Sequence, residues 1–233
     1  MERRRIYKVI AMVSDKGGVG KSTWAASLTH AFNKAMGRNA AVLVDMDPSG
    51  TSTMLGSPNC RGAGSLTFIT TKLDLVLCTK ETDGGEIDVV PPGRAESLID
   101  SKDAVAAYDE MVSILGEHYL IIVVDLPGVP VEYSPLVAHA ARSADMLVVV
   151  TTQDAIHMAR RLVTAFNTKP IYVILNQYIE GHGGVSDVEA MGTSKWGKLY
   201  TVAPFSGCVK DAVLRRRLPT LACKDFEKYV DEA

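Results

Sequence analysis

The sequence lacks the features that mark a metal-cluster carrier, a secreted protein or a membrane protein. Its 233 residues include only four cysteines, Cys60, Cys78, Cys208 and Cys223, and none of them forms a C-x-x-C pair. This spacing indicates neither a zinc site nor a cluster-carrier motif, so we expect reduced, mostly buried thiols. The basic first five residues precede an apolar run with the length of a strand, not of a signal peptide, and no apolar stretch is long enough to span a bilayer. The sequence therefore predicts a cytoplasmic protein.

A strong excess of charge of either sign is also missing. The chain has 25 basic and 27 acidic residues and a formal net charge of −2, so any contact with nucleic acid or an acidic membrane must use a local patch. Neither an internal repeat nor a linker is present, and 47% of the residues are hydrophobic. We therefore expect one large α/β domain over residues 1–233.

The most informative stretch is residues 6–23, which read IYKVIAMVSDKGGVGKST. The run rich in β-branched residues predicts a buried strand, the glycines predict a turn, and a helix is expected from Ser22. Backbone N–H groups of such a turn close on oxyanions, and the helix dipole adds partial positive charge. In this pattern Lys21 reaches the β and γ phosphates and the Ser22 hydroxyl holds Mg²⁺. The expected phosphate-binding residues are Gly17, Gly18, Val19, Gly20, Lys21, Ser22 and Thr23.

Asp15 stands where the usual phosphate loop has its first glycine, and Lys16 follows it. Two lysines around G-G-V-G make this a deviant Walker A loop, and the sequence resembles the ParA/MinD family of P-loop ATPases. The resemblance implies the P-loop NTPase fold, ATP as the nucleotide, and a homodimer in which Lys16 contacts the nucleotide of the other subunit, as an arginine finger does. A carboxylate at position 15 could weaken phosphate binding if it points inward.

Carboxylates follow two further predicted strands. The strand Ala40–Asp45 ends in D-M-D-P-S-G, and the strand beginning at Tyr119 ends at Asp125, before Leu-Pro-Gly. Because parallel strands present functional groups at their carboxyl ends, we expect these carboxylates to face the nucleotide. The resemblance implies that Asp47 positions the attacking water, that Asp45 supports the Mg²⁺ shell, and that Asp125 binds Mg²⁺ through water. Asp-Pro-Ser-Gly is also ordinary turn chemistry, so this segment alone leaves both interpretations open.

The rest of the chain alternates between strand and helix patterns. We expect a mostly parallel twisted sheet of about seven strands with helices on both faces. Residues 51–86 are the least clear and are expected to form short helices and a strand that cover one edge. Residues 181–197 predict a mobile loop around a short helix. The other expected helices are 22–36, 95–116, 134–143, 154–167 and 209–217, and the other expected strands are 87–90, 145–151, 171–175 and 199–203.

Asn176 comes at the end of the strand predicted over 171–175, and Pro204 directly follows the strand predicted over 199–203. The resemblance implies that Asn176 contacts adenine, as an asparagine at this position does in the family. It also implies that the strand ending before Pro204 leads into a helix that closes over the base. The context N-Q-Y-I lacks the N-K-x-D pattern of many guanine-binding proteins, which favours ATP. The resemblance runs from about Lys8 to Pro219.

The segment after the core decides between branches of the family. Residues 224–233 are too acidic for a membrane-binding helix, and cluster carriers need the missing C-x-x-C pair. What remains is a DNA-partition ATPase, which the resemblance places on the nucleoid with a ParB-like adaptor protein as partner and no membrane. The residues expected to contact non-specific DNA are Lys210, Arg215, Arg216 and Arg217.

Four alternatives stay open. Arginines in the last turn of a helix also complement its dipole without binding DNA. The chain could instead be a MinD-like spatial regulator without a membrane helix, or an ATP-dependent metabolic enzyme of related fold. The last alternative is a regulator that binds nucleotide and scarcely hydrolyses it.

Overall fold

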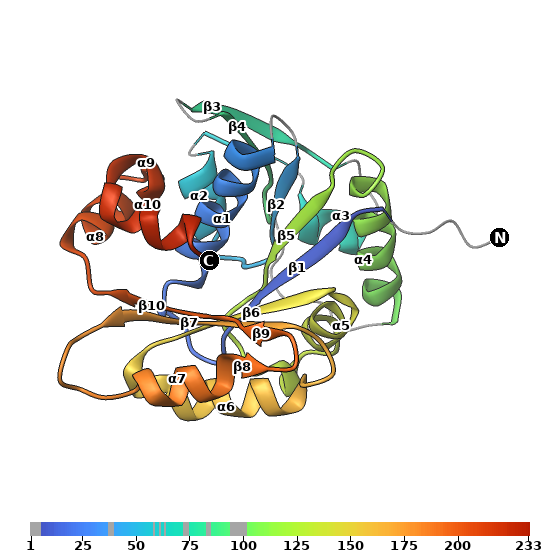
Figure 1. Ribbon diagram of the computed structural model, residues 1–233. Helices are drawn as coiled ribbons and strands as arrows, with labels where there is room; N and C mark the ends of the chain where they lie inside the picture. Colours follow the sequence, from blue (N-terminus) through green and yellow to red (C-terminus); the bar gives the residue numbers. More distant parts are fainter. Residues whose placement is uncertain are drawn as a thin grey trace.

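The computed structural model describes residues 6–36, 40–57, 59–60, 62, 64–71, 75–82, 85–93 and 102–233. One eight-stranded sheet in the order β10-β7-β6-β1-β5-β2-β4-β3 forms its centre (Figure 1). Every neighbouring pair is parallel except β3 and β4, which are antiparallel. The strands are β1 (Lys8–Val13), β2 (Ala41–Asp45), β3 (Cys78–Thr82), β4 (Gly85–Val90), β5 (Ile121–Asp125), β6 (Met146–Thr151), β7 (Ile171–Tyr178) and β10 (Tyr200–Pro204).

The position of β1 fixes the position of the site. β1 pairs with β5 on one side and with β6 on the other. The chain builds the β5 side of the sheet first and then crosses to the β6 side. A crevice forms at such a reversal of strand order, outside the carboxyl ends of the strands. The glycine-rich turn that follows β1 therefore opens into this crevice.

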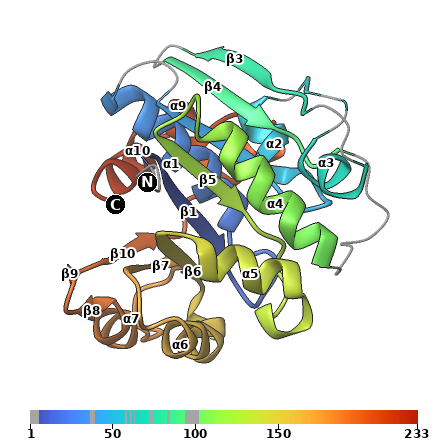
Figure 2. The same ribbon diagram turned by 90° about the vertical axis from the view of Figure 1, so that its right-hand side faces the viewer.

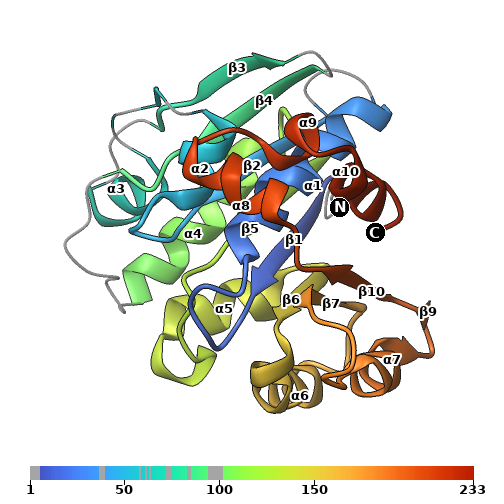
Figure 3. The ribbon, with the colours of Figure 1, turned by 90° about the vertical axis from the view of Figure 1, so that its left-hand side faces the viewer.

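Helices cover both faces of the sheet, as the apolar residues on both sides of its strands require. One face is covered by α1 (Lys21–Met36), α2 (Thr51–Gly56), α8 (Gly207–Leu214), α9 (Pro219–Ala222) and α10 (Lys224–Asp231) (Figure 3). The other face is covered by α3 (Ser65–Thr71), α4 (Lys102–Leu115), α5 (Pro135–Ser143), α6 (Ile156–Ala165) and α7 (Val185–Gly192) (Figure 2). Each face has its own hydrophobic cluster.

The last helix, α10, packs its apolar side on α1. Phe226 and Val230 are buried, and the Phe226 ring meets the Trp24 ring edge-on with centroids 5.0 Å apart. Lys34 of α1 pairs with Glu227 and Asp231, at 2.9 and 3.3 Å. The apolar face of α10 is therefore covered by the domain itself. Among the described helices, none has the length and hydropathy needed to cross a membrane.

The predicted α/β sheet with helices on both faces is confirmed, with differences at its edges. The sheet has eight strands where about seven were expected; the strand expected within residues 51–86 is β3, which lies antiparallel to β4 at the edge. Residues 181–197 contain the expected short helix, α7, but continue into a hairpin of β8 (Thr193–Ser194) and β9 (Gly197–Lys198). The helix predicted over 95–116 is observed from Lys102, and residues 94–101 lie outside the described part of the chain, as do residues 1–5.

The prediction of reduced thiols is wrong. Cys60 and Cys78 form one disulfide and Cys208 and Cys223 form another, with Cα atoms 5.6 and 6.0 Å apart. Sequence spacing alone did not reveal the pairs because 18 and 15 residues separate their members. The fold brings each pair within the Cα distance that a disulfide needs.

Candidate nucleotide-binding site

The glycine-rich turn has the backbone of an anion-binding loop. Gly18 and Gly20 have φ angles of 78° and 92°, in the left-handed region that glycine adopts most easily. A Cβ atom at Gly20 would lie 2.2 Å from Nδ2 of Asn176, so only glycine fits between the loop and β7. α1 begins at Lys21, which places the N-terminus of a 16-residue helix against this loop.

A cavity of about 830 Å³ lies beside the loop. It brings together Lys16, the expected loop residues 17–23, Asp47, Asn176, Pro204 and Lys210. Its volume is in the range of small-molecule and cofactor sites. Asp45, Asp125, Arg215, Arg216 and Arg217 do not line it. The residues expected on the loop side thus line the cavity, whereas Asp45 and Asp125, which were expected to face the nucleotide, lie behind its surface.

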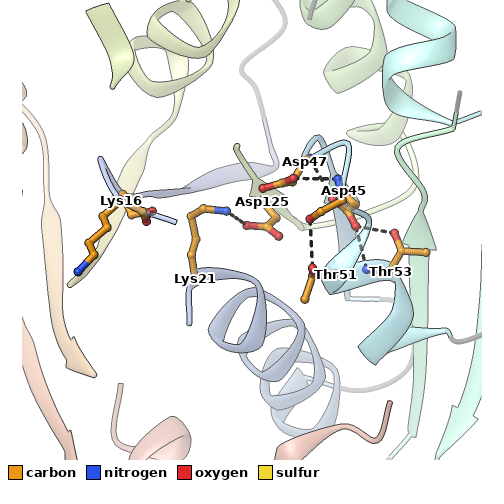
Figure 4. Close-up of polar contacts among 9 residues, drawn as sticks. Lys16, Lys21, Asp45, Asp47, Thr51, Thr53 and Asp125 are labelled. Atoms are coloured by element: carbon orange, nitrogen blue, oxygen red, sulfur yellow. Dashed lines mark hydrogen bonds and ion pairs between the residues drawn. The ribbon is translucent and has the colours of Figure 1, made fainter. Parts of the chain in front are cut away.

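Lys21 and Asp125 form a buried ion pair behind the loop. Nζ of Lys21 lies 2.6 Å from Oδ1 of Asp125, and their side chains are 5% and 0% exposed (Figure 4). Oδ2 of Asp125 is buried and has no hydrogen-bond partner among the described residues. A buried carboxylate oxygen without a donor suits a hydrated cation, and Mg²⁺ beside a nucleotide needs only one or two protein ligands. The donor set of Ser22 and Asp125 therefore fits Mg²⁺.

Asp45 organises the turn after β2. Its Oδ1 accepts from the Asp47 backbone N–H at 3.0 Å, and its Oδ2 accepts from the N–H and hydroxyl of Thr53 at 2.9 and 2.7 Å (Figure 4). Burial, and then the charge of Asp125, raises the pKa of this carboxyl, while the Thr53 bonds oppose that rise. Asp45 thus holds Asp47, which lines the cavity, in its place.

Lys16 also borders the cavity, but its side chain points away from Lys21 and Asp125 (Figure 4). Its ammonium pairs with Asp154 in the 3-10 helix η2 (Gln153–Ala155), and 42% of its side chain is exposed. Thr152 donates a second hydrogen bond to Asp154 at 2.5 Å. The bond from Lys16, and then that from Thr152, lowers the pKa of Asp154. The two lysines of the loop therefore face different surroundings.

Asp15 does not face the cavity. Its side chain borders a much smaller space between the loop and α6, and its Oδ1 is buried without a hydrogen-bond partner in the described chain. Burial, and then the charge of Glu132, raises the pKa of Asp15 to about 6, whereas Arg161 lowers it. The carboxylate beside the glycines thus points toward α6 and not toward the phosphate position.

The opposite wall of the cavity contains residues that sequence reasoning missed. Phe205, Leu214 and Phe226 line it, and the first two are 53% and 74% exposed. Large apolar side chains beside a cavity suit a flat aromatic ring such as a nucleotide base. Gln177 was also missed, although it directly follows the predicted Asn176.

The basic residues predicted to contact DNA are exposed: Lys210 lies within α8, and Arg215, Arg216 and Arg217 directly follow it. Arg215 pairs with Asp211 at 2.8 Å, and Arg216 has φ 55°. Backbone N–H groups of Arg216 and Arg217 bond to the carbonyls of Val213 and Ala212. This is the Schellman pattern, whose left-handed position is usually glycine.

Comparison with known families agrees with this geometry. A family model described as the CobQ/CobB/MinD/ParA nucleotide binding domain matches residues 10–219. The match covers most of the sequence, so the chain belongs to this family of nucleotide-binding domains.

Solved structures of similar fold include ParA- and MinD-type ATPases. A chain of the MinC:MinD cell division protein complex from Aquifex aeolicus is 21% identical, with a TM-score of 0.74 over 97% of this chain and 93% of that chain. A ParA family ATPase from Chlorobium tepidum is 18% identical, with a TM-score of 0.73 over 98% and 97%. A putative plasmid partition protein from Borrelia burgdorferi, bound to AMPPNP, is 17% identical, with a TM-score of 0.70 over 97% and 95%. At these identities the likeness establishes the fold. No curated protein matches the sequence.

Proposed function

We propose that this protein is an ATPase that dimerises with bound ATP, holds DNA non-specifically as the dimer, and acts in plasmid or chromosome partition. The observation that carries the proposal is the divergence of the two loop lysines. Lys21 is buried and directed at Asp125, whereas Lys16 is half exposed and paired outside the cradle. An exposed cation on a phosphate loop is available to a second subunit, and stabilising transition-state charge from outside the site is a strong catalytic device.

Within one subunit, each residue has a separate task. Lys21 exchanges its contact with Asp125 for the β and γ phosphates, while the loop N–H groups bind phosphate oxygens. Ser22 and Asp125 would hold Mg²⁺, which when bound would supply charge neutralisation on the phosphates. Asp47, at the mouth of the cavity, orients the attacking water. Asn176 and the apolar wall around Phe205 bind the adenine ring.

Dimerisation is tested on a variant that retains ATP. Asp47→Ala protein with saturating Mg-ATP should elute as a dimer in gel filtration with light scattering, and as a monomer with Mg-ADP. Lys16→Ala in the same background should remain a monomer, because the cation offered to the second subunit is gone. A monomeric Asp47→Ala protein at saturating Mg-ATP would reject the switch.

DNA binding is supported by the exposed cluster of Lys210, Arg215, Arg216 and Arg217 on and after α8. A filter-retention assay with and without ATP should show retention that depends on ATP and falls steeply with salt. Replacing the three arginines by alanine should abolish it. Unchanged retention would remove this cluster from the proposal.

A MinD-like spatial regulator without a membrane helix is the competing function. The covered apolar face of α10 weighs against membrane attachment through that helix, since Phe226 and Val230 are buried against the domain. An ATP-dependent dimer that retains no DNA would favour this second function. Stimulation of the ATPase rate by DNA together with a ParB-like adaptor would favour partition.

A further inference from the structure

Two consecutive side chains at the end of β7 bond to the phosphate loop. Nδ2 of Asn176 donates to the carbonyl of Val19 at 2.8 Å, and Nε2 of Gln177 donates to the carbonyl of Gly18 at 3.3 Å. Asn176 is almost fully buried, whereas Gln177 is exposed and lines the nucleotide cavity. Neighbouring loop carbonyls are thus held by neighbouring amides.

A regular strand could not do this, because successive side chains point to opposite faces of a sheet. Gln177 has φ 56°, and this left-handed backbone turns its side chain to the same side as that of Asn176. The pairing of β7 with β10 shifts register at the same level: Val202 pairs with Leu175 and Pro204 with Tyr178, so β7 contains one extra residue there. A non-glycine residue is disfavoured in this conformation, and such local strain often accompanies a functional contact.

The two amides determine where the loop presents its donors. In a trans peptide the C=O of one residue and the N–H of the next point in opposite directions. When the carbonyls of Gly18 and Val19 are held toward β7, the N–H groups of Val19 and Gly20 face away from β7. These are donors that a phosphate loop offers to an anion.

We propose that Gln177 is a positioning residue for nucleotide binding, which fixes the peptide after Gly18 so that the Val19 N–H is available to a phosphate oxygen. The inference rests on the proposed function, because it concerns the same ATP site. Gln177 acts through the loop backbone and takes no part in the chemical step. Its loss should therefore weaken nucleotide binding and leave the fold intact.

Substitutions at position 177 can separate backbone strain from the amide contact. Gln177→Gly removes the amide and suits the left-handed backbone, so its melting temperature should equal or exceed that of the wild type. Gln177→Ala removes the amide and keeps the strain, so its melting temperature should be lower than that of Gln177→Gly. Both should bind a non-hydrolysable ATP analogue about 5-fold more weakly in calorimetry, as expected for one lost hydrogen bond. KM should rise by a similar factor, with kcat nearly unchanged.

Gln153→Ala is the matched control. Gln153 is another amide at this edge, and it bonds to Ile179 and Gly183, outside the cavity. Its loss should not change nucleotide affinity. Wild-type affinity in Gln177→Gly, or equal weakening in Gln153→Ala, would overturn the positioning role while leaving the proposed ATPase standing. Failure of the wild-type protein to bind the analogue would overturn the proposed function itself.

Discussion

Lys16 and Asp154 form an ion pair within one chain, between the phosphate loop and the segment that leads into α6. Thr152 also bonds to Asp154 and so helps to fix the carboxylate. If Lys16 serves the nucleotide of a second subunit, it must first leave Asp154. In the proposed dimer, the pair would therefore compete with dimerisation.

Removing Asp154 should favour the dimer. Asp154→Ala in the Asp47→Ala background should dimerise at lower protein concentration with Mg-ATP, by up to about 30-fold, because each of the two subunits releases one exposed ion pair that contributes about 0–1 kcal/mol. Sedimentation velocity over a concentration series measures this shift. Asp187→Ala is the control, since it breaks the exposed Arg160–Asp187 pair elsewhere on the same side of the sheet. Weaker dimerisation of Asp154→Ala would show that Asp154 supports the interface instead.

Asp15 should make stability depend on pH. Its pKa is raised from 3.8 to about 6 in the folded protein, so the folded state binds more protons between these values. The contribution of this group to stability is therefore present at low pH and is lost as the pH rises through about 6. Asp15→Asn should raise the melting temperature at pH 7.5 and change it much less at pH 4.5. Glu180→Gln, an exposed loop change, should show no such difference. An equal shift of Asp15→Asn at both pH values would contradict the prediction.

The disulfide between Cys208 and Cys223 should stabilise the apolar wall of the cavity. It joins α8 to the start of α10, and both helices contribute to that wall. The chain-entropy model gives about 3 kcal/mol for a closed loop of this length. Cys208→Ser should therefore lower the free energy of unfolding by about 2–4 kcal/mol in denaturant titration.

Thiol titration of the denatured protein checks both disulfides directly. Without reductant it should detect no thiols, and after reduction it should detect four, one for each cysteine. The Cys208→Ser protein should show one free thiol before reduction. Four thiols in the untreated wild-type protein would refute both pairings.

Arg216 offers a test that separates folding from DNA binding. Its φ of 55° lies at the position of the α8 C-terminal motif that glycine prefers. Arg216→Gly should therefore raise the free energy of unfolding by up to about 1 kcal/mol. If Arg216 contacts a phosphate, the same change should weaken DNA retention and reduce the salt slope by about 1. A more stable protein with unaltered retention would assign Arg216 to the helix end alone.

The residues that local motifs singled out on the loop side line one cavity. The glycine turn, the lysines and Asp47 were recognisable because the chemistry and the backbone geometry depend on adjacent residues. The role of Asp45 was harder to predict, since burial of its carboxylate against Thr53 depends on the path of the chain after β2. The direction of Asp15 likewise depends on α6, which is more than 130 residues away in the sequence.

Features created by tertiary contact were missed. Cysteine pairing followed from the folding of the β3 edge and of α8 against α10, which spacing does not encode. In the sequence, Phe205 and Leu214 look like ordinary apolar residues. Their place in the lining of the cavity becomes visible only in the folded chain. The position of Gln177 beside Asn176 was a possible signal for a role at the site. In a regular strand, however, its side chain would point to the face opposite that of Asn176.

The phosphate loop is held by residues that are very distant in sequence. Lys21 meets Asp125 across 104 residues, Lys16 meets Asp154 across 138, and Asn176 meets Val19 across 157. Loop closures of this length form late and slow the folding of a chain. A newly made polypeptide would therefore acquire affinity for its ligand only after both halves of the sheet have assembled. Ligand added during refolding should then act on the completed domain and slow its unfolding, with little effect on the rate at which it first forms.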